Sequence, residues 1–279
     1  MSKWNLTNLK RNGDNLRIFI VEFTFLLIVV YIIIPDFVLR CIGIGSWKKQ
    51  NTLGVAITFD DGPHPDYTPK VLDILERYKV PATFFVVGEN AAAYPELIKE
   101  IQGQGHRLGI HCQQHICSWF LNPWETWSKW DEGVATLESL TGQKVELIRP
   151  PWGVFNMALW LWLRHRKMKV VLWNVEGFDW LTQRSPEQIT KRVLRKTTAG
   201  SIVLLHDAGG QPGAPKNTIC ALESICRKIA VEKKLPFVSL DLTKNGLEAS
   251  PACRWSWRTC RFVQTFCRSK YTSPITRRL

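Results

Sequence analysis

Two adjacent carboxylates, Asp60 and Asp61, follow a short apolar run and precede Gly62-Pro63. The apolar run predicts a buried strand, which the Gly-Pro pair ends. Ligands bind at the carboxyl ends of strands in α/β folds. Neighbouring carboxylates repel, so both ionise readily only when a positive group lies beside them. The acidic pair therefore indicates a site for a cation, with a solvated Asp-Gly-Pro turn as the alternative.

Two histidines, His111 and His115, follow a later apolar run. At a spacing of four they share one face of a helix, so both imidazoles can reach one cation. A carboxylate from another strand end, Asp60 or Asp61, would complete a set of two histidines and one carboxylate. The alternative is a histidine pair that binds no metal.

Ionisable and aromatic residues recur after three further apolar runs. The first of these segments is Arg149-Pro150-Pro151-Trp152-Gly153, the second runs from 173 to 180, and the third is Leu204-Leu205-His206-Asp207. Arg149 can hold one aspartate ionised through a bidentate contact. Because five successive strand ends carry such residues, we expect them to form one site.

The elements that must position these residues are short strands alternating with helices. Ser185 before Pro186 is a strong helix start. Alternation of this kind predicts parallel strands with helices outside, and we expect an α/β fold, a distorted (β/α) barrel of about seven parallel strands. The expected strands are 54–59, 82–87, 106–110, 145–148, 169–173, 201–205 and 236–240, and the expected helices are 67–79, 94–104, 124–141, 155–166, 186–198 and 217–234.

A long apolar segment precedes this region. It predicts a membrane anchor over 18–39, after a basic N-terminus at 1–17, and no small-x-small cleavage site follows it. The basic residues place the N-terminus inside and the remainder outside the cytoplasm, in a single-pass membrane protein. We expect a linker over 40–53, the folded domain over 54–245 and a basic, cysteine-containing tail over 246–279.

The charge balance indicates anionic partners. The formal net charge is +13, and the sequence pI is about 9.5. The chain has no nucleic-acid-binding motif, so we expect an anionic membrane face or an acidic wall polymer rather than nucleic acid. The tail is predicted to be solvated, with contact to anionic lipid or polymer as its functional alternative. No C-x-x-C pair occurs among the eight cysteines, which disfavours a cysteine zinc site.

The five segments together resemble the motifs of the polysaccharide deacetylase family, also called the NodB homology domain or carbohydrate esterase family 4. In chain order they are Thr58 to Pro63, His111 to His115, Arg149 to Gly153, the Asp179-Trp180 region and Leu204-x-His206. The resemblance covers about residues 53–240. It implies a distorted barrel of parallel strands and helices.

The resemblance also implies a metal-dependent hydrolysis of N-acetyl groups on amino sugars. Asp61, His111 and His115 would bind a divalent ion. We expect zinc, with cobalt or another transition metal as the alternative. Water on that ion would attack the acetyl carbonyl. Asp60 would be the general base, and Arg149 would orient it. His206 would be the general acid that protonates the leaving nitrogen.

The remaining motif positions would support these groups. Asp179, or Glu176 as the second choice, would keep His206 protonated. The backbone N–H of Trp152 would bind the oxyanion. We expect substrate contacts from Pro150, Trp152, Trp180 and Leu204. The family usually has Ser or Thr where this chain has Cys112, and we interpret that cysteine as a buried one.

The resulting expectation is a membrane-anchored N-deacetylase of N-acetylglucosamine-containing glycan, such as peptidoglycan or a chitooligosaccharide. One alternative is a deacetylase or deformylase of a lipid-linked amino sugar. An alternative of a different class is a non-catalytic glycan-binding protein on the same fold.

Overall fold

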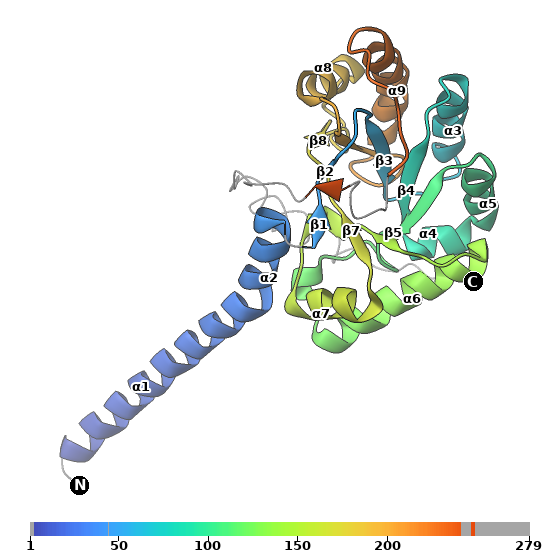
Figure 1. Ribbon diagram of the computed structural model, residues 1–279. Coiled ribbons are helices and arrows are strands. Elements are labelled where there is room, and N and C mark those ends of the chain that lie inside the picture. The colour runs from blue at the N-terminus through green and yellow to red at the C-terminus, as the bar shows by residue number, and fades with distance from the viewer. Residues whose placement is uncertain (1–2, 44, 241–246, 249–279) are drawn as a thin grey trace.

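The computed structural model describes residues 3–43, 45–240 and 247–248. A long N-terminal helix projects from a domain in which helices surround a curled sheet (Figure 1). The predicted tail lies outside the described residues, except for two that form β10 (Leu247–Glu248). That strand pairs antiparallel with β2 (Lys49–Gln50).

Eight parallel strands form the main sheet, in the order β1-β7-β6-β5-β4-β3-β9-β8. Within the described residues, all strand pairs of this sheet are parallel. The sheet curls into a half-barrel. It is open, with β1 and β8 as its two edge strands. The strands are β1 (Ser46–Trp47), β3 (Ala56–Asp60), β4 (Ala82–Val86), β5 (Arg107–Ile110), β6 (Leu147–Ile148), β7 (Lys169–Val171), β8 (Val175–Glu176) and β9 (Ile202–His206).

The predicted α/β barrel is confirmed, with three differences in its strands. Residues 236–240 form no strand and contribute only an isolated bridge between Phe237 and Val55. β8 is an additional strand, two residues long. β1 lies inside the segment 40–53 that we expected to be a linker, and it adds to the sheet by pairing with β7. Strands of two residues are too short to leave a periodic signal in a sequence.

The helices follow the strands as the alternation predicts. They are α3 (Thr68–Arg77), α5 (Pro95–Gly103), α6 (Pro123–Thr141), α7 (Met157–Arg166), α8 (Pro186–Lys196) and α9 (Ala214–Val231), with an additional short α4 (Gly88–Ala93). Ser185 caps α8 in a capping box with Gln188, as its position before Pro186 indicated. Asn122 caps α6 in the same way.

β3 is an interior strand of the sheet, between β4 and β9, and all five of its residues are buried. Phe59 stacks on Phe84 of β4, with ring centroids 5.0 Å apart. In the register of the sheet, Asp60 is opposite Phe85 on one side and His206 on the other. Packing therefore fixes the strand that ends in the acidic pair, and pairing brings its last residue beside His206.

The N-terminal segment is one helical run from Lys3 to Ile42, divided into α1 (Lys3–Ile28), η1 (Val29–Ile33), α2 (Ile34–Asp36) and η2 (Phe37–Ile42). The stretch Asn15–Ile42 is long and apolar enough to cross a membrane, and a signal sequence near an N-terminus has the same character. Its last turns contact the domain, where Pro35, Asp36, Leu39 and Cys41 are buried.

Candidate active site

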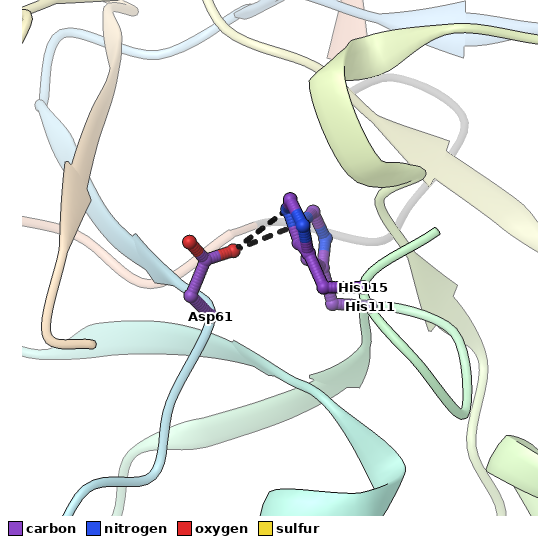
Figure 2. Close-up of side chains that lie close together, drawn as sticks. All are labelled: Asp61, His111 and His115. Carbon is purple, nitrogen blue, oxygen red and sulfur yellow. Dashed lines mark ion pairs between the residues drawn. The ribbon is translucent and has the colours of Figure 1, made fainter. Parts of the chain in front are cut away.

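Asp61, His111 and His115 converge on one point from the ends of β3 and β5. The Nε2 atoms of His111 and His115 lie 3.4 Å and 3.2 Å from Asp61 Oδ1, as Figure 2 shows. One ligand atom from each of the three residues lies within 4.8 Å of the other two. Sequence reasoning predicted this trio, and the structure brings it together.

The helical geometry expected for the histidine pair is wrong. Residues 111–115 form a loop after β5, with a bend over 113–115, rather than a helix turn. Cys112 has φ +69°, in the left-handed region, so the chain reverses its twist directly after His111. The two imidazoles still meet, with centroids 5.4 Å apart, because the loop folds back over the strand end. Cys112 itself is buried, as expected.

The trio fits a divalent cation on the evidence of its own atoms. Asp61 Oδ1 and His111 Nδ1 are buried and have no hydrogen-bond partner among the described residues. Burial lowers the pKa of His111 to about 4, so this imidazole is neutral at pH 7. Burial by itself raises the pKa of Asp61, but the imidazoles of His115, His206 and His111 bring it well below its usual range. An ionised carboxylate and neutral imidazole nitrogens make a typical transition-metal donor set.

Asp60 lies beside this trio and forms an ion pair with Arg149, which follows β6. Arg149 Nη1 donates to Asp60 Oδ1 at 2.7 Å. The pairing is single rather than the bidentate contact we expected, because the other guanidinium nitrogens donate elsewhere in the barrel. Nε donates to Val171 O at 2.9 Å, Nη2 to Leu172 O at 3.1 Å, and Nη1 also to Thr58 Oγ1 at 2.8 Å.

Arg149 is fully buried, and this lowers its pKa despite the charge of Asp60. Its guanidinium also lies over the ring of Phe85, 4.2 Å from the centroid. Together these contacts hold the guanidinium beside Asp60 and away from solvent. Thr58, the first residue of the first motif, had no role assigned from the sequence, and it accepts from Arg149 and donates to Val203 O at 2.7 Å. Its motif position was the signal, but its partners lie on distant strands.

His206, the last residue of β9, lies on the other side of the acidic pair and contacts Asp179. Its Nδ1 is 3.0 Å from Asp179 Oδ1, and its backbone N–H donates to Asp179 Oδ2 at 2.7 Å. Thr218 Oγ1 donates to the same Oδ2 at 2.8 Å. Burial alone lowers the pKa of His206, but the charge and hydrogen bond of Asp179 outweigh it and raise this pKa to about 10.

The two carboxylates proposed as partners of His206 have different surroundings. Asp179 is buried and is the one in direct contact. Glu176 ends β8, and burial raises its pKa above the usual range, while the charge of His206 opposes this. Its Oε1 lies 3.4 Å from the indole Nε1 of Trp180. Our first choice, Asp179, is therefore the residue that the geometry supports.

The other predicted substrate contacts lie in or beside the same loops. Trp152, in η4 (Pro151–Gly153), packs edge-on against His115 with centroids 4.3 Å apart. Pro150 is buried, and its carbonyl accepts from Gly153 at 2.8 Å. Leu204 is buried within β9, between Thr58 and Glu176 in the register. Contact of these residues with a substrate stays a prediction.

Backbone strain gathers in these loops. Asp61, Cys112, Trp152 and Phe178 each have φ between +57° and +75°, which is uncommon for residues with a side chain. Each lies directly in or beside one of the five motifs. In the rest of the described chain the other positive-φ residues with side chains are three lysines, at Lys79, Lys167 and Lys234. Strained conformations of this kind cluster at functional sites, where packing holds them.

Asp207 is a buried carboxyl group that sequence reasoning did not assign. Thr68 Oγ1 donates to its Oδ2 at 2.6 Å. Burial raises the pKa of Asp207 to about 7, although the Thr68 hydroxyl opposes the shift. A Cβ at Gly62 would meet the Asp207 carboxylate, so glycine is required there for the turn to close. Its position next to His206 was the only signal in the sequence.

Comparison with known proteins agrees with this geometry. A family model described as polysaccharide deacetylase matches residues 48–171. The chain is 35% identical over 190 residues to a peptidoglycan-N-acetylglucosamine deacetylase of Bacillus cereus, covering 68% of each protein. It is 32% identical over 203 residues to a chitooligosaccharide deacetylase of Bradyrhizobium, covering 72% of this chain and 90% of that one.

Solved structures show the same fold. One is a crystal structure of a peptidoglycan N-acetylglucosamine deacetylase, with TM-score 0.67 and 32% identity, over 74% of this chain and 94% of that one. Another is a family 4 pseudoenzyme of Bacillus anthracis, with TM-score 0.60 and 27% identity, over 67% of this chain and 63% of that one. On the extent and identity of these matches, this chain belongs to the polysaccharide deacetylase family and is a glycan deacetylase, a hydrolase of carbon–nitrogen bonds other than peptide bonds.

Proposed function

We propose that the enzyme removes N-acetyl groups from N-acetylglucosamine-containing glycan, with Asp60 as general base and His206 as general acid. The observation that carries the proposal is the pairing on either side of the ligand trio. Asp60 is paired with Arg149, and His206 is paired with Asp179. One flank therefore places a carboxylate against a guanidinium, and the other holds an imidazole protonated.

Asp61, His111 and His115 would hold the divalent cation, and their donor set suits zinc, with cobalt or another transition metal as the alternative. When bound, such an ion polarises a carbonyl oxygen and lowers the pKa of water. Asp61 Oδ1 lies 3.2 and 3.4 Å from two imidazole nitrogens. The cation would offset the repulsion between the lone pairs of these three atoms.

Asp60 would accept the proton of the attacking water. The guanidinium of Arg149 forms an ion pair with Asp60 Oδ1 at 2.7 Å. Because Arg149 is held by two carbonyls and a hydroxyl, it can orient Asp60 Oδ1 while Oδ2 stays directed toward the site. Oδ2 lies 4.0 Å from His111 Nε2.

His206 would donate its proton to the leaving nitrogen, since an amine leaves far more readily than its anion. A pKa raised to about 10 keeps the imidazolium form across neutral pH. The contact between Asp179 and Nδ1 leaves Nε2 as the donating atom. Asp179 is thus a positioning residue that acts through His206.

The backbone N–H of Trp152 would bind the oxygen that gains negative charge. The left-handed conformation of Trp152, with φ +57°, sets the direction of this segment. The indoles of Trp152 and Trp180 would line the sugar-binding groove together with the Pro150 and Leu204 segments, since aromatic faces pack well on sugar rings.

The relatives named above suggest peptidoglycan or a chitooligosaccharide as the substrate. A lipid-linked amino sugar is the second candidate, and the attachment of the N-terminal helix to the domain favours it. The third candidate is a non-catalytic glycan-binding role, and the family includes a pseudoenzyme of Bacillus anthracis. The trio and both flanking pairs are present here, which argues against that role.

For the N-terminal helix we propose a transmembrane anchor over about residues 15–34, since roughly 20 helical residues cross a bilayer. This range lies closer to the N-terminus than the 18–39 expected from sequence, because residues from Pro35 onward pack on the domain. The basic N-terminus would stay inside, and the catalytic domain would be extracytoplasmic. The basic tail would contact anionic lipid or polymer.

Acetate release from peptidoglycan and chitooligosaccharides by the full chain in detergent, with zinc added, tests the proposed function. Asp60→Asn should reduce the rate about 100-fold or more while bound zinc, measured by elemental analysis, is unchanged. Asp61→Asn should lose both zinc and activity. Asp66→Asn, an exposed aspartate outside the site, is the matched control. No acetate from any N-acetylated glycan, or full activity of Asp60→Asn, would reject it.

A further inference from the structure

The end of the N-terminal helix packs on the loops that carry the catalytic residues. Tyr31 OH donates to the carbonyl of Leu121 at 2.9 Å, in the segment that follows His115. The backbone N–H of Phe155 donates to Asp36 Oδ1 at 3.0 Å, just beyond Trp152. Figure 1 shows α2 beside α7 and α1 pointing away from the domain. The helix is therefore joined to the active-site end of the barrel.

An exposed apolar surface lies at this junction. Beyond Ile42, six large hydrophobic side chains are exposed in the described part of the chain. Four of them belong to η3 (Ser118–Phe120) and the outer faces of α6 and α7. This aromatic patch consists of Phe120, Trp124, Trp127 and Leu161, which are 61%, 81%, 36% and 53% exposed.

The patch is one surface rather than scattered residues. Trp124 and Trp127 are three apart on α6, so they share a helical face. Trp127 Nε1 donates to Ala158 O at 3.1 Å, which brings that face against α7, one turn from Leu161. Phe120 directly precedes Leu121, the residue bonded to Tyr31. The patch therefore begins beside the helix, whose exposed apolar side chains include Ile34 and Phe37.

Polar groups border the patch in a manner typical of a membrane interface. The last turn of α7 carries Arg164, His165 and Arg166, all exposed, and Arg166 is paired with Asp131 at 2.7 Å. Trp127 stacks on His165, with centroids 5.5 Å apart. Tryptophan and tyrosine are enriched at headgroup level, and basic residues there favour anionic lipids.

We propose that the aromatic patch lies in the interfacial layer of the bilayer crossed by the N-terminal helix, so that the active-site end of the barrel faces the membrane. The proposal rests on the proposed anchor. The occupant is lipid because the patch begins at Phe120, next to Leu121, whose carbonyl accepts from Tyr31 at the end of the proposed anchor. The substrate then is glycan within reach of the bilayer, such as glycan linked to a lipid.

A photo-crosslinker placed in the patch tests this directly. The full chain with Trp124→benzoylphenylalanine, reconstituted in phosphatidylglycerol–phosphatidylcholine vesicles and irradiated, should form lipid adducts detectable by mass spectrometry. The same crosslinker at Val231 or Leu53, which are 67% and 78% exposed and lie away from the patch, serves as the matched control. We expect at least about tenfold more adduct at residue 124, given the preference of a large apolar side chain for an apolar environment.

Equal adduct yields at residues 124 and 231 overturn the proposal, and so does an adduct to protein instead of lipid. Extraction of the vesicles with alkaline carbonate distinguishes failure of the interfacial patch from failure of the anchor. A chain released by carbonate has no anchor, and the proposal falls with it. A retained chain without lipid adducts has an anchor but no interfacial patch. Acetate release is measured in parallel, so that failure of the proposed catalytic function is distinguished from failure of the interfacial patch.

The substrate consequence is tested with Trp124→Glu, outside the catalytic machinery. Its rate on free chitooligosaccharide should equal that of the parent. Its rate on the same oligosaccharide coupled to a phospholipid in the vesicle should fall about tenfold, since a charged residue leaves the interface. Equal rates of variant and parent on the lipid-coupled substrate contradict the proposal. If the rates of the variant on the free and on the lipid-coupled substrate fall together, the lipid adduct yield at residue 124 decides whether the patch contacts the bilayer.

Discussion

Asp179 contacts His206 twice, through Oδ1 at 3.0 Å from the imidazole Nδ1 and through Oδ2 at 2.7 Å from the backbone nitrogen. The same carboxylate therefore sets the charge of the imidazole and the position of its main chain. The contact with Asp179 raises the pKa of His206 to about 10, whereas burial lowers the pKa of His111 to about 4.

The first prediction concerns the alkaline limb of the pH–rate profile. Asp179→Asn removes the charge that keeps His206 protonated, so the pKa of His206 falls toward and below its ordinary 6.5. The alkaline limb should move to lower pH by roughly two units or more, and the rate at pH 8 should drop. Thr218→Val removes only a hydrogen bond to Asp179 Oδ2 and should shift the limb far less. An unmoved limb in Asp179→Asn excludes His206 as the acid.

The second prediction concerns the stability contribution of Arg149. Arg149→Met leaves Asp60 and two carbonyls without their donor in a buried position, so unfolding should become easier by about 3–5 kcal/mol. Urea unfolding of the full chain in detergent measures this. Arg166→Met is the matched control, because Arg166 forms a similar pair with Asp131 at the surface and should cost about 1 kcal/mol or less. Similar losses in both variants would contradict the role assigned to burial.

The third prediction concerns the space behind Asp61. A Cβ at Gly209 would collide with Asp61 Oδ2, and the backbone there has φ +66°. Gly209→Ala should therefore displace Asp61 and weaken zinc binding about tenfold or more, measured by competition with a chelator. Gly213→Ala carries a similar conformational cost, with φ +80°, and its Cβ would meet nothing within 4 Å. It should retain zinc, and equal weakening in the two variants would show that strain alone is responsible.

The fourth prediction concerns the pH dependence of stability through Asp207. Its folded pKa is raised to about 7 from 3.8, so the folded state holds a proton that the unfolded state loses first. This contribution to stability is fully present below pH 3.8 and is lost as the pH rises to about 7, at roughly 1.4 kcal/mol per unit. Asp207→Asn, which keeps the shape and can still accept from Thr68, should flatten that slope in metal-free protein. An unchanged slope would assign it to other groups.

Removal of the metal is the fifth test. Dialysis against a chelator should abolish acetate release, and added zinc should restore it, since Asp61, His111 and His115 then regain their cation. The thermal unfolding midpoint of the zinc-loaded chain should also exceed that of the chelated chain. Full activity after complete zinc removal, verified by elemental analysis, would contradict metal dependence.

Several parts of this structure follow from local sequence. The buried strand before Asp60 is apolar throughout, and its five residues are buried in the sheet. Ser185 and Pro186 mark the start of α8 where they stand in the chain. Such features depend on neighbours a few residues away, and strand–helix alternation then leads to parallel strands. Spacing left Asp60 and Asp61 as alternatives beside His111 and His115, and the resemblance to the family singled out Asp61.

Other parts were decided only by contacts between distant segments. β1 and β8 exist because they pair with β7 and β9, and two residues cannot carry a periodic pattern. The histidine pair meets through a left-handed Cys112 rather than a helix. The single Asp60–Arg149 bond results from competition by Val171, Leu172 and Thr58 for the guanidinium.

The sequence by itself determined which residue types stand at the strand ends, because hydrophobic periodicity and turn chemistry are local properties. The tertiary structure alone decided which atoms face one another, how deeply Arg149 and Asp179 are buried, and that Tyr31 and Asp36 fasten the N-terminal helix to the catalytic loops. Burial and long-range pairing set charges and pKa values, and neither exists until the chain has folded.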